Sequence, residues 1–219
     1  MLYFCPIYGE LFEGQVSYNW YSDSFKLRSN GADNTIIDLW NSVSAPPAPE
    51  LKSVSVDPKT SALLILDMET TICKSPRCTA SISNINSLLM QARKNNMLVV
   101  YSLTHAGNPR DITKQLAPMP GDPIVKSNVD KFYKTNLEEI LHKKGIKTVI
   151  VTGFAANGAV LHTATSSAFR GFNVIVPVDC MSTANILYSE QYTAWHMLNS
   201  PGTRDKAVLS KVNLINFLH

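Results

Sequence analysis

The sequence predicts a three-layer α/β/α sandwich, in which helices cover both faces of a mostly parallel, six-stranded sheet. The first observation is a complete strand–helix–strand unit between Thr148 and Thr183. Its first strand, 149–151, is a β-branched run suited to burial on both faces. A helix with apolar residues at helical spacing follows over 159–170, and a second strand over 174–176. A second observation is that apolar runs alternate with amphipathic segments elsewhere in the chain.

The remaining elements come in the order that such a sheet requires. The run 62–66 is continuously apolar, as expected of a central parallel strand. Residues 81–95 place Ile85, Leu88, Leu89 and Ala92 on one face of a helix. Thr135 is a helix cap with acidic residues after it and basic residues at the far end. The other expected elements are strands over 97–103, 123–125 and 206–210 and a helix over 189–198.

An aromatic arm precedes this domain. Residues 1–50 comprise the arm and a stiff, proline-rich linker at 45–49, and residues 51–219 form the predicted domain. We expect a short strand ending at Trp20 and a helical turn ending at Trp40. This much apolar surface should be buried against protein. Two alternatives remain open: the arm lies on its own domain, or it reaches a partner subunit or covers the site.

Composition narrows the class of protein. The chain has 219 residues, of which 45% are hydrophobic, and carries a formal charge of +3. The charge is too small and scattered to predict binding to nucleic acid or membrane. No apolar run approaches 18 residues, and the first residues lack the pattern of a signal peptide. The four cysteines match no zinc motif, so we expect free thiols in a reducing cytoplasm.

Two features point to chemistry at one edge of the sheet. Asp67 ends a buried strand, where a carboxylate is costly unless it is paired or used. Ligands of open α/β sheets bind beyond the carboxyl ends of the strands. The corner 153–158 is made almost entirely of small residues. Such a corner lets backbone amides and the positive end of the helix dipole contact a small ligand.

The corner resembles a signature of the isochorismatase-like hydrolases, often called cysteine hydrolases. Their signature is a strand, a Gly-x-x-Thr-Asn-x-Cys-Val turn and a Thr-Ala helix. The residues at those places are Gly153, Ala156, Asn157, Ala159, Val160, Thr163 and Ala164. The resemblance covers about residues 58–215 and implies a Rossmann-like topology. It also implies a homo-oligomer acting on a small-molecule substrate, without a cofactor.

The resemblance assigns a catalytic set. Asp67 corresponds to the catalytic aspartate, and Lys126 matches the catalytic lysine by its register to Phe132 and Thr135. Lys131 is a near neighbour that this register disfavours. We therefore expect Asp67 and Lys126 to form a partly buried ion pair within reach of position 159.

The turn itself supplies the rest of the expected site. In cysteine members two turn amides, here those of Ala155 and Ala159, form the oxyanion hole. A non-proline cis bond would fall at Phe154–Ala155. Ala156 and Asn157 complete the turn.

Alanine occupies the position of the nucleophile, and three interpretations follow. Ala159 excludes a covalent thioester there. In the first interpretation, which the resemblance implies, the chain hydrolyses a vinyl ether with Asp67 as general acid and water as the attacking group. Members that hydrolyse isochorismate also lack the cysteine, and Ala156 resembles their turn. Alternatively, it is a cysteine amidohydrolase whose nucleophile has been replaced, which Asn157 favours. The third interpretation is an inactive homologue that binds a small molecule or partner.

Other reactive side chains receive weaker assignments. His105 follows a strand where nicotinamidases of the family place an Asp-x-His metal motif, but no carboxylate accompanies it. We therefore predict no metal and treat His105, Phe132 and Cys180 as candidates for the pocket wall. A buried structural thiol is the simpler interpretation of Cys180. His162 and His196 are interpreted as ordinary histidines with satisfied hydrogen bonds.

Overall fold

A computed structural model describes residues 34–218 of the chain. Residues from Ala48 onward form one compact unit around a seven-stranded sheet. The strand order is β4-β3-β2-β5-β6-β8, with every neighbouring pair parallel, and β7 pairs with β5 off this path. The strands are β2 (Ser61–Leu66), β3 (Leu98–Leu103), β4 (Ile124–Lys126), β5 (Thr148–Phe154), β6 (Asn173–Pro177), β7 (Met181–Ser182) and β8 (Ala207–Ser210). The predicted fold class is confirmed, and β7 is a strand that the sequence did not indicate.

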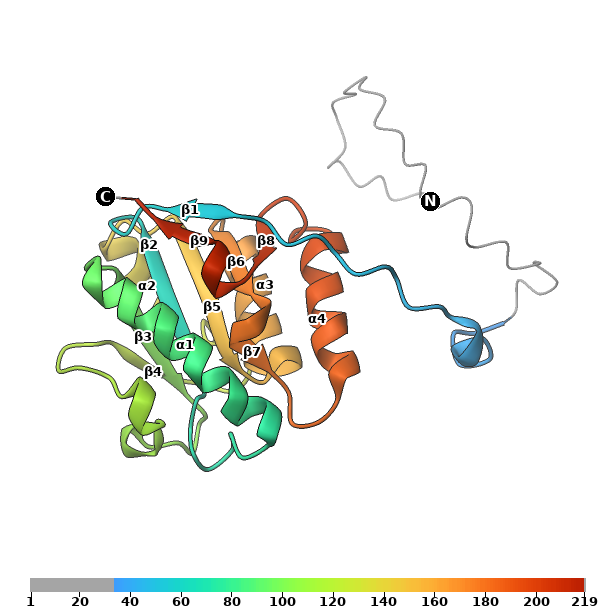
Figure 1. The fold of residues 1–219 in the computed structure, drawn as a ribbon, viewed down its shortest axis with the longest axis horizontal. Coiled ribbons are helices and arrows are strands. Elements are labelled where there is room, and N and C mark those ends of the chain that lie inside the picture. The colour runs from blue at the N-terminus through green and yellow to red at the C-terminus, as the bar shows by residue number, and fades with distance from the viewer. Residues whose placement is uncertain (1–33, 219) are drawn as a thin grey trace, which may run out of the picture. The chain divides into compact units, whose positions relative to one another are not determined.

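Helices form the two outer layers (Figure 1). Helix α1 (Pro76–Lys94) packs on one face, where Leu63 and Ile65 of β2 meet it. On the other face, Leu64 and Leu66 share a core with α2 (Leu137–Lys143), α3 (Leu161–Phe169) and α4 (Leu187–Asn199). The two-stranded sheet β1 (Val54–Val56) and β9 (Ile215–Phe217) lies on the α1 side. Alternation along β2 thus divides the interior into two apolar clusters, one on each side of the sheet.

The starts of α1, α3 and α4 differ from the sequence prediction, and α4 begins at Leu187 and not at residue 189. Helix α1 begins at Pro76 and not at Ser81, because Ser75 accepts a hydrogen bond from the Cys78 amide and proline suits the first position. Helix α3 is preceded by one π-helical turn, Ala156–Val160, in which Gly158 departs from helical geometry. Single 3₁₀ turns occur at Trp40–Ser42, Pro109–Asp111, Lys114–Leu116, Val178–Cys180 and Val212–Leu214.

Only the end of the aromatic arm falls within the described residues. The turn predicted near Trp40 is present at Trp40–Ser42. The Trp40 side chain is 61% exposed in the single chain. The strand predicted near Trp20 lies outside the described residues. Burial of the arm at a subunit contact stays a prediction.

The expectation of free thiols is wrong for two cysteines. Cys73 and Cys78 form a disulfide, because the loop after β2 folds back and brings their Cα atoms within 5.4 Å. Cys180 is a free, fully buried thiol, as predicted. Cys5 lies outside the described residues. None of the helices in 34–218 is long and apolar enough to cross a membrane.

Candidate active site

Asp67 stands directly after β2, with only 5% of the residue exposed. Its backbone has a φ of 50°, a left-handed conformation that aspartate tolerates better than most residues. One carboxylate oxygen, Oδ1, accepts a 2.7 Å hydrogen bond from the Ser102 hydroxyl of β3. The other, Oδ2, lies 2.7 Å from the Nζ atom of Lys131. The buried Asp67 carboxylate is therefore paired with a cation and a hydroxyl donor, as expected for a charge that is costly to bury alone.

Lys131 is completely buried. Besides Asp67, its ammonium group faces the backbone carbonyls of Leu103 at 3.4 Å, Ser127 at 3.1 Å and Asn128 at 2.5 Å. An ammonium group has three protons to donate, so these four oxygen atoms more than satisfy it. The surrounding backbone fixes the positive charge beside Asp67.

The predicted ion pair between Asp67 and Lys126 is wrong. Lys126 is the last residue of β4, and its side chain is exposed. Beyond it the chain doubles back, and the Ser127 hydroxyl donates to the Asp130 carbonyl at 2.9 Å. That turn brings Lys131 into the interior and leaves the Lys126 side chain exposed to solvent. The lysine nearer to Phe132, which the motif register had disfavoured, therefore takes the position.

The small-residue corner lies beside Asp67 because Gly153 permits close contact. Gly153 pairs with Leu66 across β5 and β2 and has a φ of 121°. A Cβ atom there would stand 2.0 Å from the Leu66 carbonyl oxygen, so no other residue fits. The predicted cis bond is present at Phe154–Ala155. The turn beyond it buries Ala159, which is 3% exposed.

Contacts between segments bring the three site positions to one edge of the sheet. The Lys131 amide donates to the Thr163 hydroxyl at 3.2 Å, and Thr163 lies one helical turn after Ala159. Asp67 reaches Lys131 directly, and the residue before it pairs with the start of the corner. The strand end before Asp67 thus lies beside the start of the corner, with Lys131 and not Lys126 at the carboxylate, and the reach from Asp67 to position 159 stays a prediction.

Burial dominates the electrostatics of Asp67. Removal from water raises the pKa of its carboxyl above the ordinary value. Lys131 and the Ser102 hydrogen bond lower this pKa, but the net result is a raised pKa. The negative charge of Glu69 raises it further. Asp67 thus holds a proton to higher pH than an exposed aspartate.

Comparison with known proteins agrees with this geometry. The isochorismatase domain model matches residues 61–204, which include Asp67, Lys131 and the whole corner. This chain belongs to the isochorismatase family.

Individual relatives match different shares of this chain. A secreted isochorismatase effector of Verticillium dahliae is 36% identical over 118 residues, covering 49% of this chain and 62% of that protein. An N-carbamoylsarcosine amidase of Arthrobacter is 39% identical over 67 residues, covering 30% of this chain and 25% of that enzyme. A cysteine hydrolase structure from Pseudomonas syringae pv. phaseolicola superimposes with a TM-score of 0.65 at 17% identity. It covers 76% of this chain and 95% of that one. The relatives named as amidases are hydrolases, and the family is one of hydrolases.

Glu69 is a buried polar residue of this isochorismatase-family site that sequence reasoning missed. It is 1% exposed, and its carboxylate accepts from the Thr104 amide at 2.6 Å and the Thr104 hydroxyl at 3.2 Å. A Cβ atom on Gly107 would collide with this carboxylate, 2.1 Å from Oε2. A carboxylate two residues beyond Asp67, at the end of a buried strand, was the available signal.

The other candidates lie in different environments. Phe132 lies in the apolar core, where its ring stacks on Phe172 with centroids 6.3 Å apart, and its assignment to a pocket wall stays a prediction. His105 is exposed on the loop after β3. Burial raises the pKa of the Cys180 thiol strongly, which makes it a poor nucleophile. His196 contacts Ser200 and a threonine hydroxyl on α3, as expected of a satisfied histidine.

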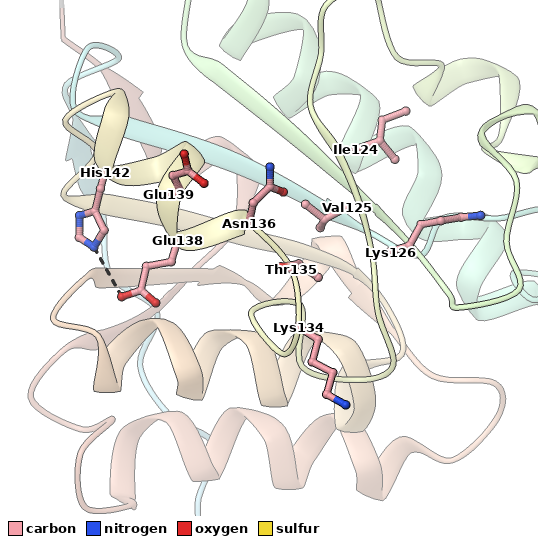
Figure 2. A pocket seen from close by; sticks show the side chains of 9 residues that line it. All are labelled: Ile124, Val125, Lys126, Lys134, Thr135, Asn136, Glu138, Glu139 and His142. Carbon is pink, nitrogen blue, oxygen red and sulfur yellow. Dashed lines mark ion pairs between the residues drawn. The ribbon is translucent and has the colours of Figure 1, made fainter.

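A separate groove of about 870 Å³ lies between β4 and α2 (Figure 2). Lys126 and Lys134 line it and point in different directions, and Asp67 is not part of its wall. Diverging lysines do not converge on one anion, so this groove has no evident chemistry. Within residues 34–218, histidine, cysteine and acidic side chains form no cluster of three that could hold a metal. The absence of a metal stays a prediction.

Proposed function

We propose that this isochorismatase-family hydrolase cleaves a small vinyl ether such as isochorismate, with Asp67 as general acid and no covalent intermediate. The observation that carries the proposal is the combination of Ala159 at the nucleophile position with a buried Asp67 whose pKa is raised. An alanine methyl group cannot attack a carbonyl, whereas a protonated aspartate can still donate.

The proposed reaction balances with water as the only co-reactant. Asp67 gives its proton to the terminal CH₂ carbon of the vinyl ether, which leaves a cation shared between the adjacent carbon and the ether oxygen. Water adds to that carbon and releases a proton, and the carbon–oxygen bond of the resulting hemiketal then breaks. The products are a ketone and an alcohol, and Asp67 regains its proton. Lys131 keeps the carboxylate in position while it is ionised.

Purified protein assayed on isochorismate and on a panel of small amides tests this proposal. We expect cleavage of the vinyl ether and none of the amides, with the rate falling as pH rises through the Asp67 pKa. Asp67→Asn should lose about 10²–10⁴-fold in rate, the usual contribution of a general acid. Lys126→Met is the matched control and should retain activity, because that side chain lies outside the site. Loss of activity in both variants, or in neither, would contradict the assignment.

The second candidate function is a cysteine amidohydrolase whose nucleophile has been replaced. Asn157, which matches the amidase signature, and the identity to an amidase of Arthrobacter favour it. Ala159→Cys distinguishes the two functions. It should restore amide hydrolysis by a large factor under the second, since loss of a nucleophile costs on the order of 10⁶ in a well-studied protease. Under the first function it should leave vinyl-ether cleavage unchanged or lower. Inactivity of both proteins on every substrate would support the third interpretation, an inactive binding homologue.

We also propose a homo-oligomer in which the arm contributes to a subunit contact. The aromatic content of residues 1–45 supports this proposal, because interface anchors are commonly aromatic. Deleting these residues should lower the number of subunits per particle in solution or cause aggregation. Light scattering that gives the same subunit number for both proteins would contradict it.

The cytoplasmic location predicted from the sequence is opposed by one observation. The Cys73–Cys78 disulfide is of a kind that persists in oxidising compartments. Alkylation of thiols in freshly lysed source cells, followed by mass spectrometry, separates the two cases. A reduced pair would support the cytoplasm, and an intact disulfide would support an oxidising compartment.

A further inference from the structure

Two carboxylates follow β2 in this site, and each is bound by a hydroxyl residue of the next strand or its extension. Asp67 accepts from Ser102, and Glu69 accepts from Thr104. The pairs follow from the parallel register of β2 and β3, in which Leu66 lies opposite Ser102. Both carboxylates are nearly inaccessible, at 5% and 1% exposure. Glu69 is therefore buried and hydrogen-bonded beside the site, as Asp67 is.

The charges of this cluster do not cancel. Lys131 forms its ion pair with Asp67, and within residues 34–218 Glu69 makes no ion pair with a lysine, arginine or histidine. With both carboxylates ionised, two negative charges and one positive charge leave a net charge of −1. One proton on either carboxylate makes the cluster neutral. Because an uncompensated charge is costly when buried, the cluster favours retaining one proton.

The two carboxylates differ in their hydrogen-bond donors. Both Glu69 oxygens accept from Thr104, and one of the donors is a backbone amide, which cannot accept a bond in return. A backbone amide donor suits a negatively charged acceptor. Asp67 Oδ2 faces the Lys131 ammonium at 2.7 Å, and Oδ1 accepts from the Ser102 hydroxyl, which can turn and accept a bond from a protonated Asp67.

We propose that Glu69 is a positioning residue for catalysis: its buried carboxylate, held by Thr104, supplies a fixed negative charge that keeps the catalytic proton on Asp67. This inference rests on the proposed role of Asp67 as general acid. The raised pKa of Asp67, to which the charge of Glu69 contributes, agrees with it.

Other charged groups near the two carboxylates are few. From the turn after β4, Lys131 faces Asp67. On the loop after β3, His105 is exposed, and the Asp111 carboxylate is bound to the Asn108 amide of its own turn. On α1, Arg77 pairs with Glu190 of α4. Glu69 is thus the negative charge that distinguishes this cluster from a simple aspartate–lysine pair.

The test compares the full-length protein with Glu69→Gln, which keeps the shape and can still accept from the Thr104 amide. Carbon-13 NMR of the Asp67 carboxyl, assigned by its loss in Asp67→Asn, measures the proton directly. Glu69→Gln should move the Asp67 titration to lower pH. In the vinyl-ether assay, the falling limb of the rate–pH profile should move to lower pH with it, and activity at low pH should persist. An unchanged Asp67 titration would overturn the proposal.

A matched variant separates charge from contact. Thr104→Val removes the hydroxyl but keeps both the Glu69 carboxylate and the backbone donor, so its Asp67 titration should stay near that of the unaltered protein. A shift in Thr104→Val equal to that in Glu69→Gln would make the effect structural and overturn the proposal. If Glu69→Gln does not fold, the unaltered protein decides. Its Asp67 carboxyl must titrate at a higher pH than an ordinary aspartate. A titration at or below the ordinary value would overturn the proposal.

The NMR measurement also keeps this inference distinct from the proposed function. A protein without vinyl-ether activity, but with an Asp67 titration that moves in Glu69→Gln, would refute the substrate and leave the Glu69 effect on Asp67 standing. Activity on the vinyl ether with an Asp67 titration that does not move in Glu69→Gln would support the proposed substrate and overturn the proposed effect of Glu69 on Asp67.

Discussion

Two carboxylate–lysine pairs of nearly equal length occupy opposite environments in this molecule. The Asp67–Lys131 pair is 2.7 Å long, and its side chains are 8% and 0% exposed. The Glu139–Lys143 pair on α2 is 2.6 Å long, and its side chains are 60% and 74% exposed. The pKa of Asp67 is raised by burial, whereas the pKa of Glu139 is lowered by its hydrogen bond to Lys143. Distance alone therefore does not determine what an ion pair does, because desolvation decides the sign.

The largest effect should follow from breaking the buried pair. Lys131→Met leaves Asp67 buried without its cation, which is expected to cost about 3–5 kcal/mol of unfolding free energy. It should also raise the pKa of Asp67 further. Urea denaturation measures the loss, with Lys126→Met as the matched control, five residues away and exposed. Equal losses in the two variants would show that burial is not what distinguishes the lysines.

A smaller effect is expected from the hydroxyl that completes the buried pair. Ser102→Ala removes the donor to Asp67 Oδ1 and should cost about 1.5–3 kcal/mol, the range for hydrogen bonds to charged groups. Denaturation near neutral pH is the appropriate measurement. If Asp67 is largely protonated there, the loss should approach the smaller value for a neutral hydrogen bond. A loss at least as large as that of Lys131→Met would contradict the dominance of the ion pair.

The carboxylates of Asp67 and Glu139 should give opposite dependences of stability on pH. The pKa of Asp67 is raised in the folded state, so the proton stabilises the fold fully below the unfolded pKa of about 3.9 and the benefit is lost as pH rises through the folded pKa. The pKa of Glu139 is lowered, so its contribution is present above the unfolded pKa and lost as pH falls. Melting of the unaltered protein, Asp67→Asn and Glu139→Gln across the acid range should show differences of opposite slope. Slopes of the same sign would refute the comparison.

The smallest effect belongs to the exposed pair. Lys143→Ala should lower the unfolding midpoint only slightly, because both side chains are in water and their attraction is screened. Thermal melting at low and high salt provides the measurement. A clear loss of stability that salt removes would show that α2 depends on this pair after all.

The sequence was sufficient for the fold and for half of the site. The apolar run before Asp67 and the small corner are local patterns that predicted the central strands, and the family resemblance implied the cis bond at Phe154–Ala155. The choice between Lys126 and Lys131 depended on how the chain turns after β4, which no local pattern encodes. The Cys73–Cys78 bond was missed for the same reason, since it depends on the loop before α1 folding back.

Burial explains the remaining omission. The position of Glu69 just after a buried strand was a weak signal in the sequence, because a carboxylate in a loop is usually exposed. Its burial depends on Thr104 and Gly107, which enclose it in the folded chain. Pairing of β7 with β5 is likewise a tertiary property, because two residues, Met181–Ser182, are too few for a recognisable strand pattern.

The position of Lys126 has a consequence for solubility. Strand β4 is the outermost strand on its side of the sheet, so one row of its backbone amides and carbonyls lacks a partner strand. Such a row can recruit a strand from another molecule and begin aggregation. A lysine at the end of a three-residue edge strand opposes this, because a second copy would have to bring its own lysine against it and desolvate both charges. The residue excluded from the catalytic cluster thus protects the edge of the sheet.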